Sequence, residues 1–205
     1  MNRTHKFEGF VLAGGRSSRM GHDKAMLEID GVTMLRRAID LLRSLSMELG
    51  IVGSSSEFPP HLDVRVIPDD WPGAGPLGGI ATALKYSSQD WNLIIACDMP
   101  YLTSPWLEFL IHRARASSAQ AVVPRSDRGP EPMCAAYHKR AEAVVRGALE
   151  NGVRKVTDGL AVLKVEYIEP DEWKAFDSES YLFKNMNTPA DFEEAKARLG
   201  GCPKR

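Results

Sequence analysis

The sequence predicts an α/β protein with a mainly parallel central sheet, and three observations lead to this prediction. Short apolar runs alternate with segments of helical periodicity at the intervals that βαβ units require. The most uniformly apolar run, residues 93–97, is typical of a central strand. Two further apolar runs, 120–124 and 133–137, bracket a charged loop, which indicates an antiparallel excursion in the second half.

Length and composition favour one soluble domain. The chain has 205 residues, a hydrophobic content of 43% and a formal net charge of −1, which argues against a nucleic-acid partner. No apolar run is long enough to span a bilayer, and the first nine residues lack the apolar core of a signal peptide. Cys97, Cys134 and Cys202 are widely separated, as is typical of reduced thiols. We therefore expect a cytoplasmic protein with no membrane partner.

The elements of the first half follow from hydrophobic patterns and turn residues. Short apolar runs predict strands at 10–13, 51–53 and 64–67. A helix is predicted from Thr33, with an apolar face that continues to Leu49, and Gly50 is expected to end it. Glycine and proline are so frequent over 71–79 that this segment is predicted as a loop, with a second helix beginning at Gly79.

The second half adds helices with clear start signals. Thr103 or Ser104 caps a helix with Pro105 in its first turn. The remaining predicted elements, in chain order, are a helix over 139–150, a strand over 164–168 and a last helix that starts at Pro189 after the capping residue Thr188.

The loop after the first strand carries the main functional signal. In FVLAGGRSSRMGHDK, a buried strand is followed at once by glycines, hydroxyls and cations, the groups that a phosphate-binding loop supplies. Five residues separate Gly15 from Gly21, so the spacing excludes a Walker A loop, and G-x-G-x-x-G is absent. A solvated basic turn is the simpler alternative. The pattern LAGG-x-S-x-R-M-G-x-D-K resembles the loop of the molybdenum cofactor guanylyltransferases and, more loosely, that of sugar-phosphate nucleotidyltransferases.

The resemblance to the molybdenum cofactor guanylyltransferases covers most of the chain. Its further motifs appear in order as VIPD, GPLGGI, CDMPYL, PEPMCAAY, GVRKV and NMNTPAD. It implies a three-layer Rossmann-like nucleotidyltransferase fold in one domain, 1–205, with GTP and Mg²⁺ bound by the N-terminal half and the acceptor by the C-terminal half. The implied reaction transfers GMP from GTP to the terminal phosphate of molybdopterin or Mo-molybdopterin and releases pyrophosphate. Other molybdenum cofactor biosynthesis proteins and apo-molybdoenzymes are expected partners.

Four separate segments carry candidate chemistry: the loop 14–24, Asp69, Asp98 and the pair Asn185 and Asn187. All but the last follow strands, and ligands of open parallel sheets bind beyond the strands' carboxyl ends, so one crevice could collect them. Asp98 is the natural Mg²⁺ ligand, with a turn or cap role as its alternative. Asp69 either accepts hydrogen bonds from a nucleotide or caps a turn. Asn187 either orients a metal-bound water, contacts substrate or steadies the last helix.

The resemblance also implies individual roles. Residues that would bind GTP and Mg²⁺ are Leu12, Ala13, Gly14, Gly15, Lys24, Asp69 and Asp98, the first three on the guanine side. Catalysis would come from charge neutralisation by Arg19, Lys24 and Asp98-bound Mg²⁺. Asn185 and Asn187 would lie near the acceptor, and we expect Arg154 and Lys155 to contribute further donors there.

The sequence departs from the resembling family at one position and leaves three alternative functions open. Some members of the resembling family have an asparagine that contacts the nucleotide where this chain has Gly53, so that contact is either missing or supplied by Ser54. A molybdopterin cytidylyltransferase, a sugar-1-phosphate nucleotidyltransferase and a nucleotide-binding accessory protein without turnover are the alternatives. The guanylyl enzymes have L-A-G-G where the cytidylyl enzymes tend to have L-A-A-G, so Gly14 favours GTP.

Overall fold

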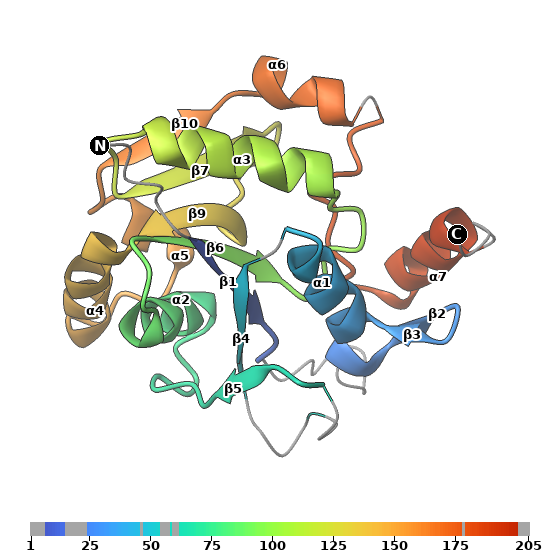
Figure 1. The fold of residues 1–205 in the computed structure, drawn as a ribbon, viewed down its shortest axis with the longest axis horizontal. Coiled ribbons are helices and arrows are strands. Elements are labelled where there is room, and N and C mark those ends of the chain that lie inside the picture. Colours follow the sequence, from blue (N-terminus) through green and yellow to red (C-terminus); the bar gives the residue numbers. More distant parts are fainter. Residues whose placement is uncertain are drawn as a thin grey trace.

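The central sheet is mainly parallel and contains some antiparallel strands (Figure 1). The computed structural model describes residues 7–14, 24–45, 47–53, 58, 62–177 and 179–200. Within them the strand order is β10-β7-β9-β6-β1-β4-β5, with β8 paired to β7. The strands are β1 (Phe7–Leu12), β4 (Glu48–Val52), β5 (Arg65–Ile67), β6 (Trp91–Ala96), β7 (Ala121–Ser126), β8 (Gly129–Pro130), β9 (Cys134–His138) and β10 (Val165–Ile168). β9 is antiparallel to β6 and β7, which confirms the predicted excursion.

Helices cover both faces of this sheet. They are α1 (Met34–Arg43), α2 (Pro76–Tyr86), α3 (Ser104–Ala116), α4 (Glu142–Glu150), α5 (Val156–Leu160), α6 (Pro170–Trp173) and α7 (Pro189–Leu199). One buried cluster joins α1 and α3 to Val11 and Ile95, and another joins α2 and α5 to Phe10 and Ile94. Successive strand residues point to opposite faces, so these clusters lie on the two sides of the sheet. The predicted three-layer arrangement is confirmed.

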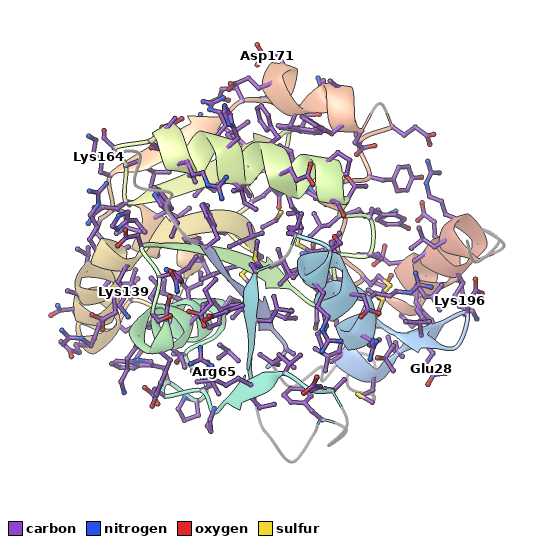
Figure 2. The ribbon with its side chains drawn as sticks, viewed as in Figure 1. Glu28, Arg65, Lys139, Lys164, Asp171 and Lys196 are labelled. Atoms are coloured by element: carbon purple, nitrogen blue, oxygen red, sulfur yellow. The ribbon has the colours of Figure 1, made fainter. Side chains whose placement is uncertain are left out.

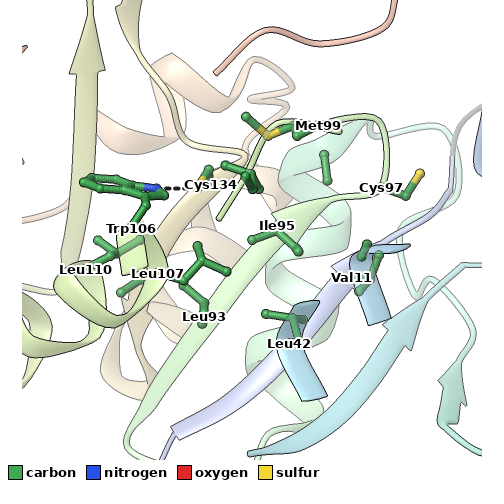
Figure 3. Packing of buried hydrophobic residues seen from close by; sticks show 14 of the residues in the cluster. Val11, Leu42, Leu93, Ile95, Cys97, Met99, Trp106, Leu107, Leu110 and Cys134 are labelled. Carbon is green, nitrogen blue, oxygen red and sulfur yellow. Dashed lines mark hydrogen bonds between the residues drawn. The ribbon is translucent and has the colours of Figure 1, made fainter. Parts of the chain in front are cut away.

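The buried cluster beneath α3 contains a hydrogen bond between an indole and a thiol, shown in Figure 3. Trp106 is fully buried, and its Nε1–H donates to Sγ of Cys134 at 3.3 Å. Burial raises the pKa of the Cys134 thiol to about 12, so the group stays protonated at neutral pH. Cys97 and Cys134 are both buried, and Cys202 lies outside the described residues.

Charged side chains project mainly from the outer elements, as Glu28, Lys164 and Asp171 do in Figure 2. Glu8 in β1 is an exception, with only 2% of its surface exposed. Its carboxylate is satisfied by the Arg65 guanidinium, the hydroxyl of Ser87 and the backbone N–H of Ser88. None of the helices in the described ranges combines the length and apolar character needed to cross a membrane.

The last helix packs against a small hairpin that follows the first loop (Figure 1). β2 (Glu28–Ile29) and β3 (Val32–Thr33) pair antiparallel. Ile29, Met186 and Ala195 share one buried cluster, which attaches α7 to this hairpin. The predicted cap of α7 is confirmed, because Oγ1 of Thr188 accepts from the N–H of Asp191 at 3.1 Å.

The predicted end of the first helix is wrong. α1 ends at Arg43, and Leu49 and Gly50 belong to strand β4. Gly50 pairs with Phe10 across the sheet, and a Cβ at Gly50 would lie 2.9 Å from a carbon of the Phe10 ring. The glycine therefore makes room for an aromatic side chain and does not terminate a helix.

The predicted start of the second helix is also wrong. α2 begins at Pro76, and the N-cap residue Gly75 has a φ of 70°, a conformation that suits glycine. Proline fits the first helical turn because the N–H that it lacks would have no intrahelical partner there. Residues 77–79 are therefore helical, not part of the loop.

The role of Gly50 can be tested with a matched pair of glycine variants. Gly50→Ala places a methyl group against the Phe10 ring and is expected to lower the free energy of unfolding by about 1–3 kcal/mol. Gly147→Ala in α4, where an added Cβ meets nothing within 4 Å, should raise it by about 0.5–1 kcal/mol. Urea denaturation measures both, and wild-type stability of Gly50→Ala would contradict the packing explanation.

Candidate functional site

The carboxyl ends of β1, β4 and β6 open into a cavity of about 360 Å³. Backbone hydrogen bonds continue the strand alignment to its edge, from Ala13 N to Val52 O at 3.0 Å and from Cys97 N to Leu12 O at 3.2 Å. Residues singled out from the sequence that line this cavity are Leu12, Ala13, Gly14, Lys24, Asp69, Asp98, Asn185 and Asn187. Segments distant in the sequence thus meet at one place, as expected for an open parallel sheet.

Other candidates are placed elsewhere or not described. Gly15 and Arg19 lie outside the described residues. Arg154 donates through one guanidinium nitrogen to the carbonyl oxygens of Leu149 and Val153, each at 2.8 Å, and so stabilises the chain after α4. Neither Arg154 nor Lys155 is among the residues that line the cavity.

The ammonium group of Lys24 joins two segments at the cavity. Its Nζ donates to Oδ2 of Asp98 at 3.1 Å and to Oδ1 of Asn187 at 2.8 Å. The side chains of Lys24 and Asp98 are 21% and 18% exposed, so water only partly screens their attraction. Asp98 follows β6 and Asn187 precedes α7, so one cation connects the central strand to the last helix.

The segment that carries the two asparagines is held over Asp98 by its backbone. Met186 N donates to the carbonyl oxygen of Asp98 at 2.9 Å, and the Met186 side chain is buried. Oδ1 of Asn185 is buried and has no hydrogen-bond partner among the described residues. A buried amide oxygen without a partner is costly, so Asn185 presents an acceptor that a ligand in the cavity can satisfy.

The loop between β7 and β9 fixes the other end of this segment. Arg128 donates to the carbonyl oxygen of Phe183 at 2.7 Å and also pairs with Glu131. Burial raises the pKa of the Glu131 carboxyl above its ordinary value, against the opposing effects of the Ser126 hydroxyl and Arg128. The charged loop therefore holds the backbone two residues before Asn185.

Asp69 makes the turn contacts that were one of its two predicted roles. Its Oδ1 accepts from the hydroxyl of Thr82 and from Trp71 N, both at 3.0 Å. No described residue hydrogen-bonds to Oδ2, and the side chain lines the cavity. One carboxylate oxygen thus stabilises the turn while the other is available to a ligand.

Several lining residues were not assigned from the sequence. Pro76 and Gly79 come from the GPLGGI motif, and Met133 comes from PEPMCAAY. Met133 is fixed at the edge of β6 because its carbonyl oxygen accepts from Ala96 N at 2.8 Å. The start of α2 at Pro76 brings the positive end of a helix dipole to the cavity, which favours an anionic ligand. The motifs were visible, but nothing in them indicated which residue faces a ligand.

Gly14 lines the cavity and lies close to Gly53. A Cβ on Gly14 would lie 3.7 Å from Cα of Gly53, an ordinary contact, and Gly14 does not have a positive φ. The backbone therefore does not require glycine at this position. A Cβ on Gly53 would instead lie 2.8 Å from the Phe58 ring, so this chain has no room for an asparagine there. Ser54 lies outside the described residues.

The side chains that line the cavity suit a metal ion whose ligands are mostly phosphate oxygens and water. No group of three histidine, cysteine, aspartate or glutamate side chains suited to a metal occurs among the described residues. Asp98 nevertheless pairs with a cationic group, because its Oδ2 lies 3.1 Å from Nζ of Lys24. Mg²⁺ bound to a nucleotide needs only one or two protein carboxylates, because phosphate oxygens and water complete its shell. Asp98 is suited to that role.

Comparison with known proteins identifies the family of this chain. The family model of the MobA-like NTP transferase domain matches residues 9–165. The chain belongs to the MobA-like NTP transferase family. A probable molybdenum cofactor guanylyltransferase from Pelotomaculum thermopropionicum is 33% identical over 92% of this chain and 91% of its own. One from a strain of Bacillus cereus is 31% identical over 95% of this chain and 98% of its own.

Solved structures support the fold of this MobA-like NTP transferase. Molybdopterin-guanine dinucleotide biosynthesis protein A from Archaeoglobus fulgidus superposes with a TM-score of 0.81 at 27% identity, covering 95% of this chain and all of the other. A 2-C-methyl-D-erythritol 4-phosphate cytidylyltransferase from Thermus thermophilus has a TM-score of 0.69 at 16% identity over 93% and 97%, a likeness of fold alone. The predicted family is confirmed, and the chain is a nucleotidyltransferase.

The two roles of Asp69 can be separated by substitution. Asp69→Ala removes the acceptor for Thr82 and Trp71 and is expected to cost about 1–3 kcal/mol in the free energy of unfolding. Asp69→Asn keeps an oxygen at that position and should retain most of the stability while it weakens nucleotide binding. Denaturation and nucleotide titration measure the two effects, and unchanged nucleotide affinity in a stable Asp69→Asn variant would leave only the turn role.

Proposed function

We propose that this chain transfers GMP from GTP to the terminal phosphate of molybdopterin or Mo-molybdopterin, with release of pyrophosphate. The observation that carries the proposal is the cavity at the strand ends, where a lysine, two carboxylates and two asparagines converge. The names of the relatives at 31% and 33% identity over most of the chain support the choice of guanine and of the pterin acceptor.

In this proposal some residues of the cavity bind GTP and others bind the acceptor. The backbone of Leu12, Ala13 and Gly14 accommodates guanine, and Asp69 Oδ2 binds the nucleoside. Lys24 and Arg19 neutralise the triphosphate, and the loop residue Gly15, which has no Cβ, lets the nucleotide approach the backbone. Asn185 offers its unpartnered amide oxygen to the acceptor. The chain then works as one domain over 1–205, with the nucleotide in its N-terminal half and the acceptor in its C-terminal half.

The chemistry requires alignment more than acid–base catalysis. The second pKa of a phosphate monoester is about 6, so the acceptor phosphate is mostly a dianion at pH 7 and needs no general base. No histidine occurs among the described residues that line the cavity. An acceptor oxygen attacks the α-phosphorus in line, a new phosphoanhydride bond forms, and the bond to the bridging oxygen of the leaving pyrophosphate breaks. Lys24 stabilises the charge that moves onto that oxygen.

Asp98 would hold Mg²⁺ together with the GTP phosphates. When bound, the ion supplies charge neutralisation at the triphosphate. The proposal includes a cytoplasmic location, and further molybdenum cofactor biosynthesis proteins and apo-molybdoenzymes as partners that take up the product.

Nucleotide preference is the decisive experiment. In a competition assay with GTP, CTP, ATP and molybdopterin, we expect a clear preference for GTP, because a site that pairs with a base edge rejects bases that leave its groups unpaired. Gly14→Ala should reduce use of GTP more than use of CTP, since a methyl group intrudes on the approach of the larger base. The backbone at Gly14 tolerates alanine, so equal loss with both nucleotides would contradict the assignment. A wild-type preference for CTP would identify a cytidylyltransferase.

The role of Asp98 is tested by Asp98→Asn, which keeps the shape of the side chain and removes its charge. Pyrophosphate release with Mg²⁺ should fall by about a hundredfold or more, since one preorganised charge is commonly worth that much in turnover. Circular dichroism and thermal melting should show an intact fold, because the Met186 contact is made by the backbone of Asp98. Near-normal Mg²⁺-dependent turnover would exclude Asp98 as the metal ligand.

A further inference from the structure

We propose that Asn187 is a positioning residue that holds the Lys24 ammonium in place for the triphosphate, and that it therefore serves the nucleotide half of the reaction. This inference rests on the proposed function and reassigns Asn187 away from the acceptor. Its starting point is the 2.8 Å hydrogen bond from Lys24 Nζ to Oδ1 of Asn187, which is shorter than the 3.1 Å contact to Asp98.

The chemistry of the contact fixes the orientation of the amide. An ammonium group only donates hydrogen bonds, so the atom of Asn187 that faces Lys24 must be the oxygen. Of the three N–H donors on Nζ, two are used by Asp98 and Asn187 within the described residues. No described residue accepts from the third, and Lys24 lines the cavity. Two contacts thus leave one donor for a phosphate oxygen.

Asn187 is suited to this task because both of its chain neighbours are fixed. On one side, Met186 is buried and its N–H is bonded to the Asp98 carbonyl. On the other, Thr188 caps α7, and Asp191 Oδ2 accepts from the N–H of Asn187 at 3.1 Å and from that of Thr188 at 2.9 Å. A side chain on a segment held at both ends can limit the rotamers of a flexible lysine, whose ordering otherwise carries an entropic cost.

Asp98 cannot perform this task alone if it also binds Mg²⁺. A carboxylate that ligates a divalent ion has its charge compensated and attracts a nearby ammonium less strongly. The amide of Asn187 is neutral, so its hold on Lys24 does not depend on that charge. Asn187 is therefore the contact that remains when Mg²⁺ and GTP occupy the cavity together.

Asn185 provides a matched control. It lies two residues earlier in the same segment, lines the same cavity and has the same side chain. Its Oδ1 has no partner among the described residues, and no hydrogen bond joins it to Lys24. A general effect of losing an asparagine from this segment would appear with both residues, whereas a function through Lys24 would appear only with Asn187.

The test is a double-mutant cycle on GTP binding without metal. Fluorescent GTP is titrated, in EDTA, into the wild type and the variants Lys24→Met, Asn187→Ala, Asn185→Ala, Lys24→Met/Asn187→Ala and Lys24→Met/Asn185→Ala. Asn187→Ala should weaken binding about tenfold in the wild type, the size of effect expected for a hydrogen bond to a charged group, and not further in Lys24→Met. Any effect of Asn185→Ala should be the same in both backgrounds.

Steady-state kinetics give a second, independent readout. With Mg²⁺ present, Asn187→Ala should raise KM for GTP and leave KM for molybdopterin unchanged, while thermal melting should remain close to wild type because the backbone contacts are retained.

Each other outcome overturns a different statement. Equal losses from Asn187→Ala in both backgrounds, or a raised KM for molybdopterin alone, would overturn the role of Asn187 and leave the proposed function intact. Failure of the wild type to bind GTP both in EDTA and with Mg²⁺ would overturn both, whereas binding only with Mg²⁺ would overturn the metal-independent role of Asn187 alone.

Discussion

The parallel pairing of β1 with its two neighbours is the constraint on which the cavity depends. Leu12 lies opposite Val52 in β4 and opposite Ala96 in β6, so the three strands end at the same level. The segments that follow these strands therefore begin at the same edge of the sheet. A slip of one residue in either pairing would turn every side chain of that strand to the other face and separate the loop glycines from Asp98.

Residues near the C-terminal end of the chain line the same cavity as the strand ends of the sheet. Lys24 and Asn187 are 163 positions apart and still share a hydrogen bond, and the backbone of Met186 is joined to that of Asp98. The family model ends at residue 165, before either asparagine. One part of the cavity is thus formed by the strand ends of the sheet, and another part by a segment that depends on α7, the hairpin and their shared buried cluster.

Sequence patterns predicted the parts of this structure that are determined locally. The strands and the cap of α7 follow from apolar runs and from Thr188 with its following proline. The end of α1 could not be predicted, because Leu45 and Leu49 continue the helical period, and only the Phe10 ring across the sheet explains Gly50. Likewise, strand ends indicated that Lys24 and Asp98 could meet. The contact with Asn187 depends on the path of residues 183–187 through space, which no local pattern encodes.

The reversed strand β9 has a consequence for how the chain is made. β6 is a highly apolar strand, and one of its edges is covered only by β9, which follows α3 and β7 in the sequence. While the ribosome is still synthesising those elements, the nascent sheet β5-β4-β1-β6 has an open hydrogen-bonding edge, the kind of surface that recruits strands from other chains. This edge of β6 is covered only after the chain has emerged as far as His138, so premature termination in this region would yield a fragment with an exposed strand edge that is prone to aggregate.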